Sequence, residues 1–122
     1  MTETVEIVDK ILADLKKVIG VEACAVASRD GLLIRAILQE GQSSESFAAM
    51  SATMFGAAET AATVLGKGIP SRVIVESDRG RLIAVGAGHR ALLIVLVSLD
   101  TGMGLILIEL ETAAKKLKDL LI

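Results

Sequence analysis

The longest apolar pattern in the chain covers residues 43–66 and lacks the charged face of an ordinary surface helix. Ser43 or Ser44 can cap its start. Between Ser46 and Gly66 the only ionisable residue is Glu59. A helix that is small or apolar nearly all round is usually covered on more than one side. We therefore expect this helix to cover its own sheet and also to meet a second copy or a partner. At 100° per residue, six apolar side chains share the face expected to pack on the core: Phe47, Met50, Met54, Ala58, Ala61 and Leu65.

Two further segments have helical periodicity, one near each end of the chain. Residues 3–19 carry an apolar stripe with charged residues outside it, and Gly20 is a suitable helix stop. Residues 101–121 repeat the pattern after a start that Asp100 or Thr101 can cap. In this segment Glu111 and Lys115 are spaced for an ion pair between neighbouring turns.

The remaining apolar segments are short and separated by turn residues, which predicts strands. Asp30-Gly31 separates the first two, and Asp-Gly between apolar runs is a strong hairpin signal. The last of these segments, residues 90–98, is apolar on both faces, which predicts that it lies in the middle of the sheet. Val73 and Val75 alternate with Arg72, Ile74 and Glu76, as on an edge strand open to pairing. The five predicted strands cover residues 21–28, 32–38, 71–77, 81–87 and 90–98.

The order α-β-β-α-β-β-β-α predicts an α+β fold with a five-stranded antiparallel sheet. At 122 residues the chain is expected to form one domain, residues 1–122. Apolar residues make up 52% of it and aromatic residues only 2%. The core is therefore expected to be built from Val, Ile, Leu and Ala.

Composition also narrows the classes of partner and the compartment. A net charge of −2 and the lack of Trp and Tyr argue against nucleic acid as a partner. A single cysteine excludes an internal disulfide and fits a reducing compartment. The first residues are acidic rather than signal-like, and Asp100 interrupts the apolar run 91–108. We therefore expect a cytoplasmic protein without membrane insertion.

Four motifs in order resemble those of the roadblock/dynein light chain family, in a small prokaryotic homodimeric form. The resemblance covers essentially the whole chain. It implies a roadblock- and profilin-like fold, with the long helix on one face of the sheet and the terminal helices on the other. The motifs are Ile19-Gly20-Val21-Glu22, the hairpin Ser28-Arg29-Asp30-Gly31-Leu32-Leu33-Ile34, the Ala- and Met-rich helix around Ala48-Ala49-Met50-Ser51-Ala52, and Gly102-Met103-Gly104-Leu105 through Ala113-Ala114.

The resemblance implies a homodimer in which the long helices pack side by side and the third strands join two sheets into one. Family members are typically non-catalytic regulators or scaffolds, and many bind Ras-like small GTPases, some as GTPase-activating or exchange components. We accordingly predict a homodimeric scaffold or regulator of such a GTPase. The residues predicted at the dimer or partner interface are Ala48, Ala52, Phe55, Glu59, Ala62, Val73 and Val75.

No residue set predicts a catalytic, cofactor or metal site. Cys24 lies in an apolar strand and is expected to be a buried, inert thiol. His89 is the only histidine, and it lacks partners at metal-ligand spacing. Gly102-x-Gly104 opens a helix but completes neither nucleotide-binding fingerprint, so we expect close packing at the helix start to be the reason for these glycines. Arginines at or beside turns could supply an arginine finger, although solvated turn residues are the better interpretation: Arg29, Arg79 and Arg81.

Two other classes of function remain open from the sequence. A structural subunit of a larger assembly would share the dimer but be insensitive to nucleotide state. A small-ligand sensor domain would need a pocket with an aromatic or convergent polar lining. The scarcity of aromatic residues weighs against the sensor.

Overall fold

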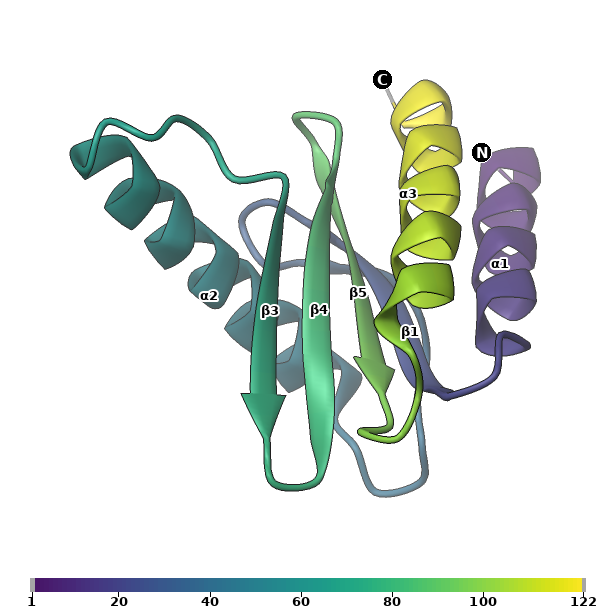
Figure 1. Cartoon of the computed structure of the whole chain (residues 1–122). Helices are drawn as coiled ribbons and strands as arrows, with labels where there is room; N and C mark the ends of the chain where they lie inside the picture. The colour runs from purple at the N-terminus through teal and green to yellow at the C-terminus, as the bar shows by residue number, and fades with distance from the viewer. Residues whose placement is uncertain (1, 122) are drawn as a thin grey trace.

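The computed structural model describes residues 2–121 as three helices and a five-stranded sheet (Figure 1). Every predicted element is present in the predicted order. The elements are α1 (Thr2–Lys16), β1 (Val21–Ser28), β2 (Leu33–Ile37), α2 (Ser44–Val64), β3 (Arg72–Ser77), β4 (Gly80–Ala87), β5 (Ala91–Val97) and α3 (Met103–Leu120).

The sheet is antiparallel throughout, with the strand order β2-β1-β5-β4-β3. The apolar strand β5 lies in the middle and β3 lies at an edge, so both sequence predictions are confirmed. Helices α1 and α3 lie side by side on one face, and α2 crosses the other face diagonally (Figure 1). The predicted α+β fold and its layers are therefore confirmed.

Each face of the sheet has its own core. The larger core lies under α1 and α3 and is almost entirely aliphatic. The smaller core lies under α2, and its largest side chain is Phe55, which is 1% exposed. Around Phe55 this core holds mainly alanines, which bring α2 close to the strands.

The helix boundaries differ from the sequence prediction at both terminal helices. Helix α1 ends at Lys16, and Ile19, predicted in its apolar stripe, is 85% exposed. Helix α3 begins after Gly102, which has no side chain to cap it. Thr101, one of the two predicted caps, instead shares a hydroxyl hydrogen bond of 2.7 Å with Ser98. Gly20 has a φ of +94°, and a Cβ there would lie 2.0 Å from Thr101 Oγ1. The segment after α1 and the segment before α3 therefore meet at Gly20 and Thr101.

Two local predictions hold. Gly31 adopts a φ of +95° in the turn between β1 and β2, as the Asp-Gly hairpin requires. Helix α2 is capped by Ser43, whose Oγ accepts a hydrogen bond from the Ser46 amide at 3.3 Å. The cap stabilises α2 by satisfying one of its free first-turn amides.

Candidate functional site: an open sheet edge and an uncharged helix flank

The face of α2 that packs on the sheet is not the predicted one. The buried residues are Ala48, Ser51, Ala52 and Phe55. The predicted core stripe contains Met50, which is 67% exposed, and Leu65, which is 73% exposed. That prediction is wrong because the alanine-rich stripe allows a closer approach to the sheet than one of methionines.

The structure also corrects part of the predicted interface. Ala48, Ala52 and Phe55 are at most 7% exposed within this one chain, packed against its own sheet. They therefore have almost no surface to offer a second copy. The other four predicted interface residues keep some exposure: Glu59, Ala62, Val73 and Val75.

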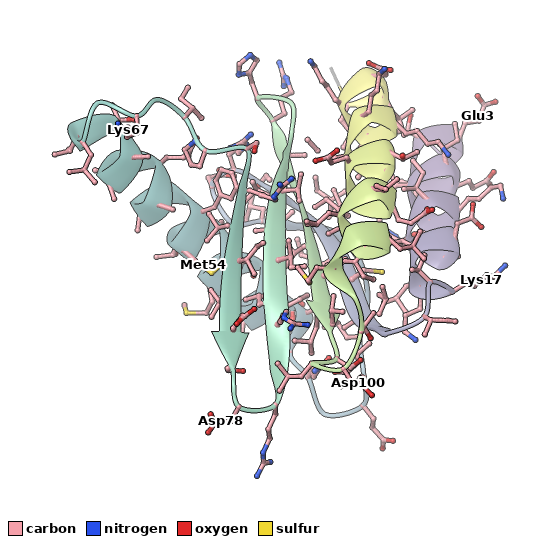
Figure 2. The ribbon with its side chains drawn as sticks, viewed as in Figure 1. Glu3, Lys17, Met54, Lys67, Asp78 and Asp100 are labelled. Carbon is pink, nitrogen blue, oxygen red and sulfur yellow. The ribbon has the colours of Figure 1, made fainter. Side chains whose placement is uncertain are left out.

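The stripe of α2 that was predicted to pack on the core instead forms a flank of the helix, on the side toward the edge strand β3. Met54 of this flank and Val73 of β3 pack against the same small core, and Figure 2 shows Met54 near β3. Met50, Ala61 and Leu65 are exposed on the flank. No charged side chain interrupts it, because Glu59 lies on the opposite, sheet-facing side of the helix.

The edge at β3 is open and regular. Its register with β4 is continuous from Arg72↔Val85 to Ser77↔Gly80. Ile74 is 40% exposed and Val75 is 41% exposed. A regular, partly apolar edge can add a strand from another chain. Together with the flank it makes one continuous surface, here called the α2–β3 surface: Met50, Met54, Ala61, Leu65, Val73 and Val75.

The opposite edge, at β2, is protected. The pairing of β1 with β2 is irregular between Val26 and Ala27. Arg35 of β2 is held by Asp9 of α1 through bonds of 2.7 Å and 3.0 Å. Irregular pairing and charged side chains both discourage further strand addition. Only one of the two edges is therefore suited to pairing.

Arg29 and Glu59 form an internal connection beside the α2–β3 surface. Arg29 Nη1 lies 3.4 Å from Glu59 Oε2, and Nη2 donates to the Gly88 carbonyl at 2.5 Å. The guanidinium also lies 5.1 Å from the centre of the Phe55 ring. Arg29 thus joins the β1–β2 turn, α2 and the β4–β5 turn. It is neither a solvated turn residue nor a free arginine finger.

The other two candidate arginines are placed differently. Arg81 lies 3.0 Å from Glu76 and also donates to the carbonyls of Leu99 and Thr101. It holds the start of α3 against β4. Arg79 is exposed at the β3–β4 turn, where the sequence placed it.

We predict that Arg29→Ala destabilises the chain more than Glu59→Gln. Arg29→Ala leaves the Gly88 carbonyl without its donor and is expected to cost about 1–3 kcal/mol of unfolding free energy. Glu59→Gln removes only a part-exposed ion pair, worth less than about 1 kcal/mol. Urea unfolding of both variants at equal protein concentration measures the difference. Equal losses would contradict this ranking.

Cys24 is buried, as the sequence predicted. It is 0% exposed, and its thiol donates to the Leu12 carbonyl at 3.5 Å. Burial raises the pKa of the Cys24 thiol from 9.0 to about 11, and the nearby charge of Lys16 partly opposes the shift. A thiol in this state is a poor nucleophile.

Cys24 is therefore expected to resist alkylation in the folded chain. Near pH 8, iodoacetamide should modify the native thiol at least about 100-fold more slowly than the thiol of the urea-unfolded chain. Because the unfolded chain loses this proton more readily, the thiol's contribution to stability should decline as the pH rises above 9.0 toward about 11. Equal alkylation rates in the two states would contradict the buried placement.

Residues 2–121 hold no group of three or more His, Cys, Asp or Glu side chains arranged for a metal ion. Within the same residues, no helix has the length and apolar character needed to cross a membrane. His89 lies exposed in the β4–β5 turn. Gly102 and Gly104 lie at the start of α3, where a Cβ at either would meet no neighbouring atom within 4 Å. Close packing, the expected reason for these glycines, is therefore absent.

Comparison with known proteins agrees with this fold. The Roadblock/LC7 domain model matches residues 7–97. Protein MJ1340 of Methanocaldococcus jannaschii is 34% identical over 111 residues, covering 91% of this chain and 96% of its own length. MglB of Myxococcus xanthus superposes with a TM-score of 0.87 at 20% identity, covering 93% of this chain and 94% of that chain. Profilin II of Acanthamoeba castellanii superposes with a TM-score of 0.59 at 22% identity, covering 94% of this chain and 96% of that chain.

Proposed function

Because this chain belongs to the Roadblock/LC7 domain family, we propose that it is a homodimeric, non-catalytic regulator or scaffold that binds a Ras-like small GTPase. We place its action in the cytoplasm, in keeping with its single, buried, reduced cysteine. The observation that carries the dimer is the α2–β3 surface, an uncharged helix flank continuous with an open sheet edge.

The proposed dimer pairs the two β3 strands and places the two α2 flanks against each other. A two-fold axis uses the same patch on both copies, so the flank and the edge are covered together. The flank suits this contact because Ala58 and Ala61 allow close approach while Met50 and Met54 adapt to a facing surface. The protected β2 edge stops further strand addition, which favours a closed dimer over a filament.

The GTPase partner is supported by family membership and by what the fold offers chemically. Within residues 2–121 the only histidine is an exposed turn residue and the only cysteine is an inert thiol. Of the three candidate arginines, Arg29 and Arg81 are held by contacts within this chain, and only Arg79 is exposed at a turn. A regulatory or scaffolding role therefore fits better than catalysis by this chain. A structural subunit of a larger assembly is the competing proposal.

Capture with defined nucleotide states tests the function. The immobilised chain is incubated with lysate of its source cell containing either GDP or a non-hydrolysable GTP analogue, and retained proteins are identified by mass spectrometry. We expect a Ras-like GTPase that is retained in only one nucleotide state. Equal retention in both states, or retention of non-GTPase proteins alone, would instead favour the structural subunit.

A further inference from the structure

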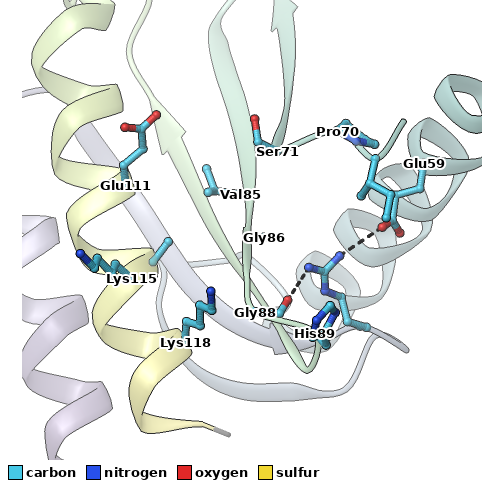
Figure 3. A pocket seen from close by; sticks show the side chains of 13 residues that line it. Glu59, Pro70, Ser71, Val85, Gly86, Gly88, His89, Glu111, Lys115 and Lys118 are labelled. Atoms are coloured by element: carbon cyan, nitrogen blue, oxygen red, sulfur yellow. Dashed lines mark hydrogen bonds and ion pairs between the residues drawn. The ribbon is translucent and has the colours of Figure 1, made fainter. Parts of the chain in front are cut away.

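A cavity of about 810 Å³ lies where β3 separates from the end of β4 (Figure 3). Strand β3 begins opposite Val85, so β4 continues past it, and the segment 69–71 crosses toward α2. The cavity is bounded by α2, this segment, the β4–β5 turn and the second half of α3. Its volume is in the range of sites for small organic ligands.

The charges around this cavity are not balanced. Its two carboxylates are already paired with arginines: Glu59 lies 3.4 Å from Arg29, and Glu111 lies 2.7 Å from Arg72. Glu111 therefore does not form the ion pair with Lys115 that the sequence spacing predicted. Neither Lys115 nor Lys118 forms an ion pair with any residue between 2 and 121. The lysines are thus the cavity's uncompensated charges.

Two glycines of the lining make room for cationic side chains, one on each side of the sheet. A Cβ at Gly88 would lie 3.1 Å from Lys118 Cγ, so the lysine stem packs closely on the β4–β5 turn. A Cβ at Gly86 would lie 2.8 Å from Arg29 Nη2, in the path of the guanidinium. Figure 3 shows the Lys118 amine directed from α3 toward this turn, on which His89 lies. Gly88 therefore lets the Lys118 stem lie against the β4–β5 turn, whereas Gly86 makes room for Arg29 on the α2 side of the sheet, where Phe55 also lies.

The rest of the lining is apolar. Ile69 and Pro70 contribute from the crossing segment, Val85 from β4 and Ala114 from α3. A free inorganic anion would leave this lining exposed to water, whereas an organic group would cover it. We propose that the cavity binds a small phosphorylated organic molecule, with its phosphate at Lys118 and His89 and its organic part against the apolar lining. This proposal does not depend on the dimer or on the GTPase.

The test is a titration of the ¹⁵N-labelled chain followed by NMR. The probes are AMP, glucose 6-phosphate, inorganic phosphate and adenosine. We expect saturable shifts of the Gly86, Gly88 and Lys118 amides with at least one organic phosphate, and affinity about tenfold weaker for inorganic phosphate and for adenosine. No saturable shift at these amides with either organic phosphate up to about 10 mM would overturn the proposal. If inorganic phosphate bound as tightly as the organic phosphates, the proposal that the apolar lining holds the organic part of the ligand would be overturned.

Three variants separate this site from general attraction to positive charge. Lys118→Gln should weaken binding about tenfold, whereas Lys116→Gln, which removes the same charge outside the cavity, should change it less than about twofold. Ser71→Phe should block the cavity without changing charge, since the Ser71 side chain is exposed. Equal effects of the two lysine variants, or unchanged binding to Ser71→Phe, would overturn the proposal. Circular dichroism confirms that each variant is folded.

Discussion

Phe55→Ala is expected to lower the unfolding free energy of this chain by about 3–5 kcal/mol, the usual cost of deleting a buried phenylalanine side chain. Phe55 is the largest side chain of the small core under α2 and is 1% exposed. Its ring also lies under the Arg29 guanidinium, so the variant removes that contact as well. The total unfolding free energy of a domain of this kind is only about 5–15 kcal/mol. Urea unfolding at a fixed protein concentration measures the loss.

Leu105→Ala is the control for this prediction. Leu105 is 59% exposed on α3, outside the α2–β3 surface, so its truncation should cost less than about 0.5 kcal/mol. Similar losses for the two variants would show that Phe55 is not a core residue. Because Ala52 is also buried against the sheet, a charge placed at Ala52 should unfold the chain rather than only separate two copies.

Ala61→Arg is expected to convert the proposed dimer into a folded monomer. Ala61 is exposed in the single chain, so an arginine there is solvated when the copies are apart. In the dimer the charge would be buried in an uncharged flank, which costs several kcal/mol. The dissociation constant should therefore rise at least about 100-fold. Sedimentation velocity should give about twice 12.7 kDa for the unaltered chain and 12.7 kDa for the variant.

Thr63→Arg provides the matched control on the same helix. Thr63 is exposed on the other flank of α2, beside Glu59 and Ile69, so the variant should remain dimeric. Equal dissociation by the two arginines would move the interface away from the α2–β3 surface. An unaltered chain that stays monomeric at micromolar concentration would contradict the dimer itself.

The sequence predicted the elements well because each carries its own local signals. The capping serine Ser43, the turn glycine Gly31 and the doubly apolar strand β5 all act through neighbours in the chain or through simple burial. The helix ends near Gly20 and Gly102 were less predictable. There, the approach of Thr101 to Gly20, 81 residues earlier in the chain, decides the backbone path.

Helix α2 shows why the candidate surface was only half predictable. Its sequence contains two stripes of small and apolar residues, and its one charge between Ser46 and Gly66, Glu59, lies on the side that the structure turns toward the sheet. Periodicity favoured the bulkier stripe, with Met50 and Met54, as the core. The structure buries the alanine stripe with Phe55 and leaves the methionines on the flank. On this helix the structure therefore exposes much of the stripe predicted to form the core, and it buries most of the residues predicted to form the interface.

The sequence by itself determined the order of elements, the central and edge strands and the scarcity of charge on α2, because periodicity, turn chemistry and composition are local properties. The tertiary structure alone decided which side of α2 meets the sheet, that Glu59 is paired with Arg29, and that Lys115 and Lys118 remain unpaired beside a cavity. These outcomes depend on the separations of side chains that are distant in the chain. Such separations are set by how closely the helices approach the strands, which no local pattern encodes.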